Sequence, residues 1–134
     1  MPVKNNDATI NRPEGSRVID APAVLIDLQK YIGQLKEEAA WEKNDRNGIT
    51  VFKTPGHTMV LSAMHAGATM EDVEVEGMLI LQVVEGAVTL ATEDDNTVEL
   101  RAQQILVLTQ QLKQNITATT DSVLLLSSIL RADQ

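Results

Sequence analysis

The chain has 134 residues, of which 43% are hydrophobic and only 2% are aromatic, so one domain with an aliphatic core is expected. Its formal net charge of −8 disfavours nucleic acids and anionic membrane surfaces as partners, because an acidic surface is repelled by both. The sequence has no cysteine, which excludes disulfide bonds, thiolate zinc sites and cysteine nucleophiles.

The first part of the chain is polar and carries no periodic pattern. Residues 1–17 are rich in Asn, Pro, Gly and Arg, and they predict a loose N-terminal arm. They lack the apolar stretch of a signal peptide, and no apolar run approaches the ~20 residues of a membrane span. We therefore expect a cytoplasmic protein.

The next segment changes from a short apolar run to a helical pattern. Residues 23–26 predict a first strand, and Asp27 predicts the N-cap of a helix over residues 27–43. The helix is expected to pack through one stripe of residues at helical spacing, namely Leu28, Tyr31, Ile32, Leu35 and Ala39. Trp41, near the end of this stripe, is expected to be a packing anchor.

From residue 49 onward the pattern has period two and is interrupted by turn sequences. It predicts short strands at 49–54, 58–65, 69–75, 79–84, 87–92, 97–100, 105–109, 114–119 and 123–130. Many short strands at even spacing favour a sandwich or barrel over a βαβ architecture. Residues 1–134 are therefore expected to form a single domain, in which one N-terminal α-helix precedes an all-β unit over 49–130.

The stretch from Gly67 to Gly86 resembles the first sequence motif of the cupin superfamily. That motif runs Gly, five residues, His, one residue, His, three residues, Glu, six residues, Gly. Counted from Gly67, its histidine positions fall on Val73 and Val75, and its glutamate position falls on Leu79. The closing glycine of the motif falls on Gly86.

The second cupin motif runs Gly, five residues, Pro, one residue, Gly, two residues, His, three residues, Asn. Started at Gln103, it places its histidine on Gln114, and none of its signature residues is matched. The resemblance covers residues 49–130 by pattern and spacing more than by identity. It implies a small single-domain cupin with a double-stranded β-helix, the jelly-roll barrel of that family.

The cupin family generally holds a metal ion with three histidines and one glutamate inside the barrel. The corresponding residues here are Val73, Val75, Leu79 and Gln114. Aliphatic side chains have no lone pair, and an amide oxygen is a weak ligand for transition metals. The sequence therefore predicts no metal and no cofactor. It also predicts that the three aliphatic residues point into the barrel as packing residues.

Acidic residues beside these positions allow an alternative, in which other side chains form a rebuilt metal site in place of the usual ligands. Strand alternation places Asp72 and Glu74 on the face opposite the two valines, whereas Glu71 shares the face of the valines at the edge of the strand. A one-residue shift in register would exchange the two faces. Glu71, Asp72 and Glu74, together with His65 near one end of the barrel, are the residues from which such a site would be built.

A ligand pocket inside the barrel is the other candidate site. We expect it to be formed by Val73, Val75, Leu79, Gln114, Met64 and His65. Gln114 is the best candidate for contacting a polar ligand, because a buried amide needs hydrogen-bond partners. The methionines of this region are expected to fill core space, and no catalytic residue is assigned.

These observations favour a metal-free cupin-fold protein that is a small-molecule-binding or structural module. A homodimer is expected, because barrels of this family commonly pair through an outer sheet and because the arm at residues 1–17 has no evident partner in its own chain. Two alternatives stay open. One is a metal-independent isomerase or epimerase acting on a small metabolite, and the other is a metal-dependent enzyme with the rebuilt site. The absence of an inward His, Tyr or Lys suited to acid–base chemistry weighs against an enzyme.

Overall fold

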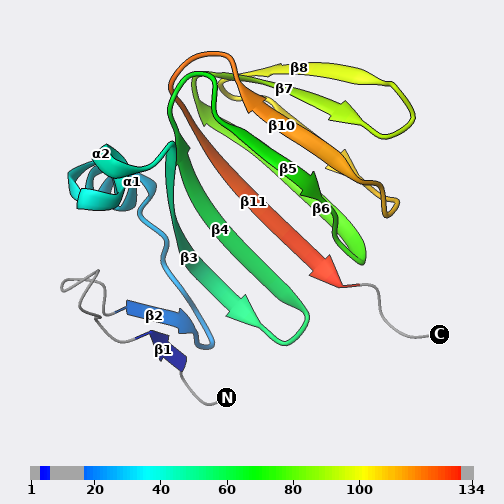
Figure 1. Cartoon of the computed structure of the whole chain (residues 1–134). Helices are drawn as coiled ribbons and strands as arrows, with labels where there is room; N and C mark the ends of the chain where they lie inside the picture. Colours follow the sequence, from blue (N-terminus) through cyan, green and yellow to red (C-terminus); the bar gives the residue numbers. More distant parts are fainter. Residues whose placement is uncertain (1–3, 7–16, 131–134) are drawn as a thin grey trace.

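The computed structural model describes residues 4–6 and 17–130 of the chain. At the N-terminal end, β1 (Lys4–Asn6) and β2 (Arg17–Asp20) pair in an antiparallel hairpin, and β2 lies beside β3 (Arg46–Thr54) (Figure 1). The guanidinium of Arg17 donates a hydrogen bond of 2.8 Å to the backbone carbonyl of Thr50 in β3. The predicted loose arm therefore includes strand structure at both of its ends, and its remaining residues lie outside the described part.

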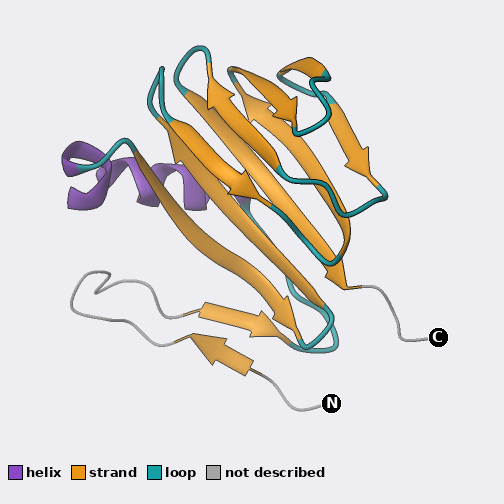
Figure 2. Cartoon of the chain, turned by 45° about the vertical axis from the view of Figure 1, so that its right-hand side comes forward, coloured by secondary structure: helices purple, strands orange, loops and turns teal. Residues whose placement is uncertain are grey.

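Two antiparallel sheets face each other in the rest of the molecule (Figure 2). The five-stranded sheet has the order β3, β4 (His57–Met64), β11 (Ser122–Leu130), β6 (Gly77–Glu85) and β9 (Ile105–Leu108). The four-stranded sheet has the order β5 (Thr69–Val73), β10 (Gln114–Ala118), β7 (Ala87–Thr92) and β8 (Thr97–Arg101). The predicted all-β jelly roll is confirmed, and each strand predicted over 49–130 is present, although several ends are shifted.

The predicted strand at residues 23–26 is wrong. These residues join no sheet, and the side chain of Leu25 is 91% exposed. A strand is stable only where a neighbouring backbone completes its hydrogen bonds, and the hairpin of β1 and β2 forms earlier in the chain instead. The apolar run is followed directly by the N-cap of the helix.

The predicted helix begins as expected and is then interrupted. The carboxylate of Asp27 accepts a hydrogen bond from the backbone N–H of Lys30, which confirms the N-cap. The helix divides into α1 (Leu28–Glu37) and α2 (Ala39–Lys43), because Glu38 adopts an extended conformation with ψ 146°. Among the described residues, no helix is long and apolar enough to cross a membrane.

A side chain from β3 accounts for the interruption. The amide of Asn47 donates hydrogen bonds to the backbone carbonyl of Leu35, at 2.9 Å, and to the carboxylate of Glu38, at 3.0 Å. Asn47 thereby satisfies a carbonyl at the end of α1 that the helix itself leaves without a partner. This tertiary contact ends α1 and docks it on the sheet.

The helix packs on the outer face of the five-stranded sheet. It contributes Tyr31, Ile32 and Leu35, whereas Ala39 of the predicted stripe is exposed because it lies beyond the break. We call the buried residues of this interface the outer cluster, which comprises Tyr31, Ile32, Leu35, Ile49, Val51, Leu61, Ala63, Val123 and Leu125. Trp41 packs against it, as expected for an anchor.

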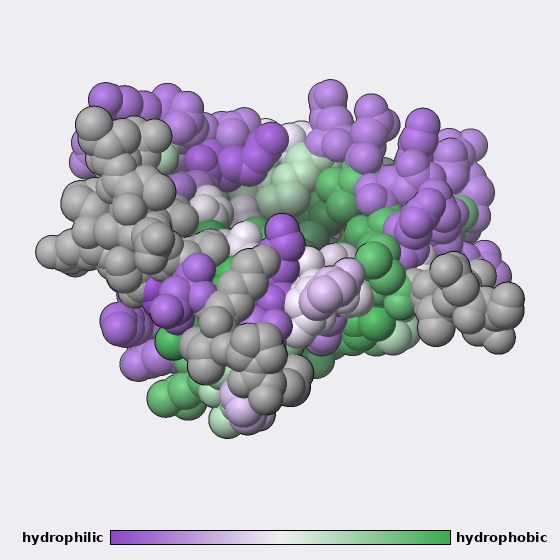
Figure 3. All heavy atoms as spheres, turned by 90° about the horizontal axis from the view of Figure 1, so that it is seen from below, coloured by the Kyte–Doolittle hydropathy of each residue, from purple (hydrophilic) through white to green (hydrophobic). Residues whose placement is uncertain are grey.

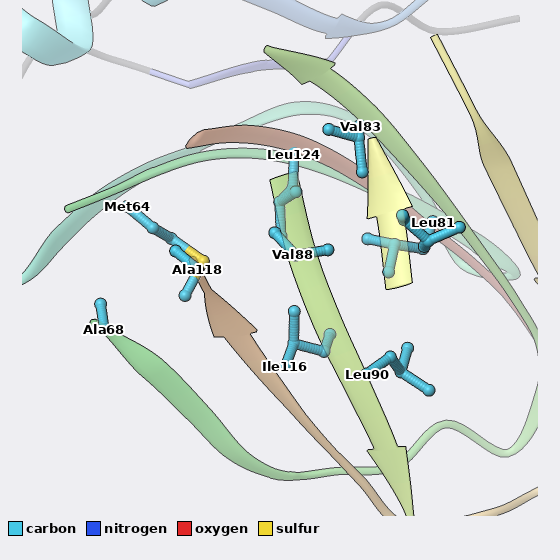
Figure 4. Close-up of a cluster of buried hydrophobic side chains, with 10 residues drawn as sticks. Met64, Ala68, Leu81, Val83, Val88, Leu90, Ile116, Ala118 and Leu124 are labelled. Carbon is cyan, nitrogen blue, oxygen red and sulfur yellow. The ribbon is translucent and has the colours of Figure 1, made fainter. Parts of the chain in front are cut away.

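A second cluster fills part of the space between the two sheets (Figure 4). This inner cluster comprises Met64, Ala68, Leu81, Val83, Val88, Leu90, Leu100, Ile116, Ala118 and Leu124. The residues belong to both sheets, and apart from Ala68 and Leu100 they are at most 1% exposed. As the composition predicts, the core is built from aliphatic side chains and methionine.

Gly86 alone connects β6 in one sheet to β7 in the other. Its φ of +84° lies in the region that favours glycine, and a Cβ atom at this position would lie 2.4 Å from the carbonyl oxygen of Asp121 and from Oγ of Ser122. The hydroxyl of Ser122 also binds the backbone of Ala87, at the start of β7. The closing glycine of the first motif is therefore required by the crossing between the sheets.

Substitution of Gly86 tests this requirement. We expect Gly86→Ala to lower the free energy of unfolding by about 3 kcal/mol, since a backbone penalty of ~1–2 kcal/mol adds to overpacking. Gly67→Ala is the matched control, because Gly67 has a φ of +88° but no atom within 4 Å of the added Cβ. Urea unfolding measures both variants. An equal loss in the two would show that the contact with residues 121 and 122 is unimportant.

Candidate functional site

A cavity of about 440 Å³ lies between the two sheets, next to the inner cluster. One wall belongs to the five-stranded sheet and includes Gly48, Val60, Ser62, Leu126 and Ser128. The other wall is β5, the edge strand of the four-stranded sheet, with the residues that follow it. Seen from below, hydrophobic residues lie in the hollow between the layers, with hydrophilic residues along its border (Figure 3).

The cavity exists because several inward-facing residues on β3, β4 and β11 are small. Gly48 pairs with Ser62, and Thr58 pairs with Ser128 of β11, so these positions share the inner face of the sheet. On β6 and β9 the same face carries leucines instead, at positions 79, 81, 106 and 108. Small side chains on one side and leucines on the other leave the space between the sheets unfilled next to β3 and β4.

Three of the residues predicted to form a ligand pocket line this cavity. They are Val73 at the end of β5, Val75 in the following loop and Leu79 in β6. Leu79 is only 4% exposed, and Val73 also packs against the inner cluster. The three aliphatic residues at the positions of the cupin metal ligands thus belong to one apolar surface.

The strand predicted at 69–75 ends at Val73 and contains a β-bulge. Gln114 pairs with Val73 and Ile116 with Met70, so Glu71 and Asp72 together oppose the single residue Asn115. Asp72 has a φ of +53°, and its backbone N–H donates a hydrogen bond of 2.9 Å to the side chain of Asn115. The bulge places Met70 and Val73 on the inner face together.

The bulge also corrects the expected position of Glu71. Simple alternation puts Glu71 on the face of Val73, whereas in the structure Glu71, Asp72 and Glu74 are all exposed. Glu74 accepts a hydrogen bond of 3.1 Å from the side chain of Gln111, outside the cavity. The extra residue in β5 turns the side chain of Glu71 away from the interior.

Two of the three remaining predicted pocket residues, Met64 and His65, lie elsewhere. Met64 is fully buried in the inner cluster and does not line the cavity. His65 stacks on Trp41 with 3.5 Å between the ring centroids, and its Nε2 donates a hydrogen bond of 2.7 Å to the backbone carbonyl of Trp41. Because β4 ends at Met64, the side chain of His65 does not continue the alternation of the strand and instead contacts α2 through Trp41.

Gln114, on the inner face of β10, does not line this cavity; it lines a separate pocket of about 150 Å³, together with residues such as Thr92 and Lys113. It is 3% exposed and pairs with Val73 on one side and with Thr92 of β7 on the other. Its Oε1 atom is buried and has no hydrogen-bond partner among the described residues. The hydroxyl of Thr92 does not supply one, because its single proton is directed to the carboxylate of Asp94, with the carbonyl of Asn96 as a second acceptor. The hydrogen bond from Thr92 lowers the pKa of Asp94.

The residues at the cupin metal positions do not fit a transition metal. Val73, Val75 and Leu79 offer no donor atom, and Gln114 offers one amide oxygen. The side chain of His65 contacts Trp41, whereas Glu71, Asp72 and Glu74 are exposed in β5 and the loop after it. Over residues 4–6 and 17–130, no three His, Asp or Glu side chains are grouped as metal ligands.

Comparison with solved structures identifies the fold. A cupin superfamily protein from Desulfitobacterium hafniense superposes with a TM-score of 0.62 at 12% identity, over 66% of this chain and 80% of that chain. A conserved protein of unknown function from Streptococcus pyogenes gives a TM-score of 0.66 at 13% identity, over 86% of this chain and 93% of that chain. The chain has the cupin fold.

Cupin-fold enzymes are also among the similar structures. Salicylate 1,2-dioxygenase from Pseudoaminobacter salicylatoxidans, solved with gentisate, gives a TM-score of 0.65 at 18% identity, over 92% of this chain but only 35% of that chain. No family model and no curated protein matches the sequence. At these identities the likeness establishes the cupin fold, and the function has to be argued from the site.

The position of Leu79 in the cavity wall can be tested by introducing a charge. We expect Leu79→Asp to lower the free energy of unfolding by about 3–5 kcal/mol, because the carboxylate would be buried without a partner. Leu25→Asp, at a position that is 91% exposed, is the control and should change stability by less than ~0.5 kcal/mol. Urea unfolding followed by circular dichroism gives both values. Similar values for the two variants would contradict the inward position of Leu79.

Proposed function

We propose that this chain is a metal-free cupin-fold binding protein that holds a small molecule in the cavity between its sheets and acts as a homodimer. The observation that carries the proposal is the cavity itself. Val73, Val75 and Leu79, which stand where the cupin resemblance places metal ligands, belong to its wall. The space used for metal chemistry in the family thereby becomes an apolar binding site, the kind of concave surface that small molecules occupy.

The lining of the cavity supports binding rather than catalysis. General acid–base catalysis needs a group that gains and loses a proton near neutral pH, such as a histidine, a carboxylic acid or a lysine. The described lining contains none of these. Its one charged side chain is that of Arg46, whose guanidinium offers hydrogen-bond donors and no acceptor.

The homodimer is supported by an apolar area on the outer face of the five-stranded sheet. The helix covers β3, β4 and β11 on this face, while β6 and β9 extend beyond it. Val107 and Ile105 on the edge strand β9 are 46% and 56% exposed. Val107 pairs with Ile80, and Met78 pairs with Ile129, so all five apolar side chains lie on this one face. A second copy would cover this area and the open edge of β9.

A metal-binding variant tests the proposed absence of metal. Purified wild-type protein should contain no stoichiometric transition metal and should show no change in Tm with Ni²⁺ or Zn²⁺. The combined variant Val73→His, Val75→His, Leu79→Glu and Gln114→His should gain stability only with metal, by about 2.7 kcal/mol at a concentration of 100 times Kd. Elemental analysis and thermal unfolding provide the readouts. A tightly bound ion in the wild-type barrel would overturn the proposal.

The proposed dimer surface can be disrupted by a single charge. We expect Val107→Lys to weaken dimerisation by about 100-fold or more, because the ammonium group would be buried against apolar side chains. Leu25→Lys is the control, since this exposed residue lies in the loop before α1. Light scattering during size-exclusion chromatography at micromolar concentration measures the mass. A monomeric wild-type protein would contradict the dimer.

A further inference from the structure

The charge of the cavity lining carries an inference about what the cavity binds, and this inference rests on the proposed binding function. The chain has 19 acidic residues and a net charge of −8, yet no Asp or Glu belongs to the described lining. The bulge in β5 contributes to this, because the three acidic residues around Val73, at positions 71, 72 and 74, are all exposed. The one charged residue of the described lining is a cation, Arg46.

The guanidinium of Arg46 lies at one end of the cavity, where β3 approaches β5. Its Nη1 atom donates a hydrogen bond of 3.1 Å to the backbone carbonyl of Thr69, at the start of β5 in the opposite sheet. The same atom donates to the exposed carboxylate of Asp45, at 3.2 Å. Nε and Nη2 make no hydrogen bond with the described part of the chain. Because a guanidinium has five N–H donors, these two atoms are available to a carboxylate.

A buried hydroxyl group lies on the same face of the sheet. Ser62 lines the cavity and is 3% exposed, and its hydroxyl makes no hydrogen bond to the described part of the chain. It pairs with Gly48 of β3, two residues after Arg46, so Ser62 and Arg46 share the inner face near the same end of these strands. Gly48 has no side chain to cover the hydroxyl, and a Cβ atom there would lie 3.9 Å from its oxygen. A ligand atom that accepts the proton of Ser62 would offset the cost of burying this group without a partner.

The rest of the described wall is mainly apolar. Its aliphatic and methionine side chains are those of Val60, Met70, Val73, Val75, Leu79 and Leu126. At the other end of β4, Thr58 and Ser128 pair with each other and are neutral. A charged group placed in this part of the cavity would be buried without a partner, which is costly. The cavity thus has one cationic end that offers hydrogen-bond donors, and an apolar remainder.

We infer that the cavity takes a small carboxylic acid with an apolar body, bound as its carboxylate. The carboxylate lies at the Arg46 end and accepts hydrogen bonds from the guanidinium and from the hydroxyl of Ser62. The apolar body packs between the wall of β4 and β11 and the side chains of Val73 and Leu79. Because the side chain of Arg46 is 41% exposed, the charged group of the ligand stays at the border of the cavity while its body is buried.

Three ligands that differ only in their head group test the inference. Decanoate carries a carboxylate, 1-decanol is neutral, and decylamine is a cation at neutral pH. Isothermal titration calorimetry of the wild-type protein, at ligand concentrations too low for micelles, should give the tightest binding for decanoate. 1-Decanol should bind about tenfold more weakly, which is the expected effect of a hydrogen bond to a charged group. Decylamine should bind more weakly still.

Substitution of Arg46 separates the charge from the apolar cavity. Arg46→Gln should remove the preference for decanoate over 1-decanol, whereas Arg46→Lys should keep part of it because the positive charge remains. Arg101→Gln is the matched control and should leave the preference unchanged. Arg101 is also exposed and paired with a carboxylate, that of Glu99 at 3.2 Å, but it does not line the cavity.

Two changes at Ser62 separate its hydroxyl from the space around it. Ser62→Ala keeps the cavity open and should weaken decanoate binding about three- to tenfold, the expected effect of one hydrogen bond. Ser62→Leu places a larger side chain in the cavity and should weaken all three ligands at least tenfold. Urea unfolding confirms that each variant is folded.

The outcomes distinguish this inference from the proposed function. If the ligands bind and Ser62→Leu weakens them, but 1-decanol binds as tightly as decanoate or Arg46→Gln keeps the preference, the carboxylate class is wrong while cavity binding stands. Full decanoate affinity in Ser62→Ala would overturn the assigned contact with the hydroxyl. If none of the three ligands binds the wild-type protein, or if Ser62→Leu has no effect, the cavity is not the binding site and both proposals fail.

Discussion

The passage of the chain through Gly86 is the constraint on which the arrangement of the two sheets depends. With one residue between β6 and β7, the inner faces of these strands are held against each other, and they carry large members of the inner cluster such as Leu81, Val83, Val88 and Leu90. Their packing closes the space between the sheets on this side. β4 reaches β5 through the longer segment 65–68, and small residues line the space there, so the cavity lies next to β3 and β4.

The local elements could be predicted where short-range chemistry decides them. Alternation and turn sequences predicted the strands, and Asp27 predicted the start of the helix, because these signals act within a few residues. The break at Glu38 depends on Asn47, which lies in the following strand and reaches the helix only after folding. The bulge at Asp72 has a similar origin, since the side chain of Asn115, far away in the sequence, stabilises it. Neither feature has a signal in its own segment.

The candidate site could be predicted only where it depends on residues close together in the sequence. The spacing of the cupin motif placed Val73, Val75 and Leu79 on one surface, and they line one cavity in the structure. Gly48 and Ser62 also line the cavity, but their position side by side depends on the pairing register of β3 with β4, which could not be predicted from the sequence. The strand predicted at 58–65 ends with His65 near one end of the barrel, yet β4 ends at Met64 and His65 turns toward Trp41. Position next to a strand end is a weak guide to the direction of a side chain.

The contact between Trp41 and His65 gives this molecule an internal optical reporter. The chain has a single tryptophan, and its indole ring is stacked on an imidazole at the junction of α2 with the sheet. Indole emission responds to the polarity of its surroundings and to contact with neighbouring groups. The fluorescence of the wild-type protein therefore records whether the short helix is docked, independently of the β-sheet signal in circular dichroism. Local release of α2 and global unfolding can be followed as separate events without any added label.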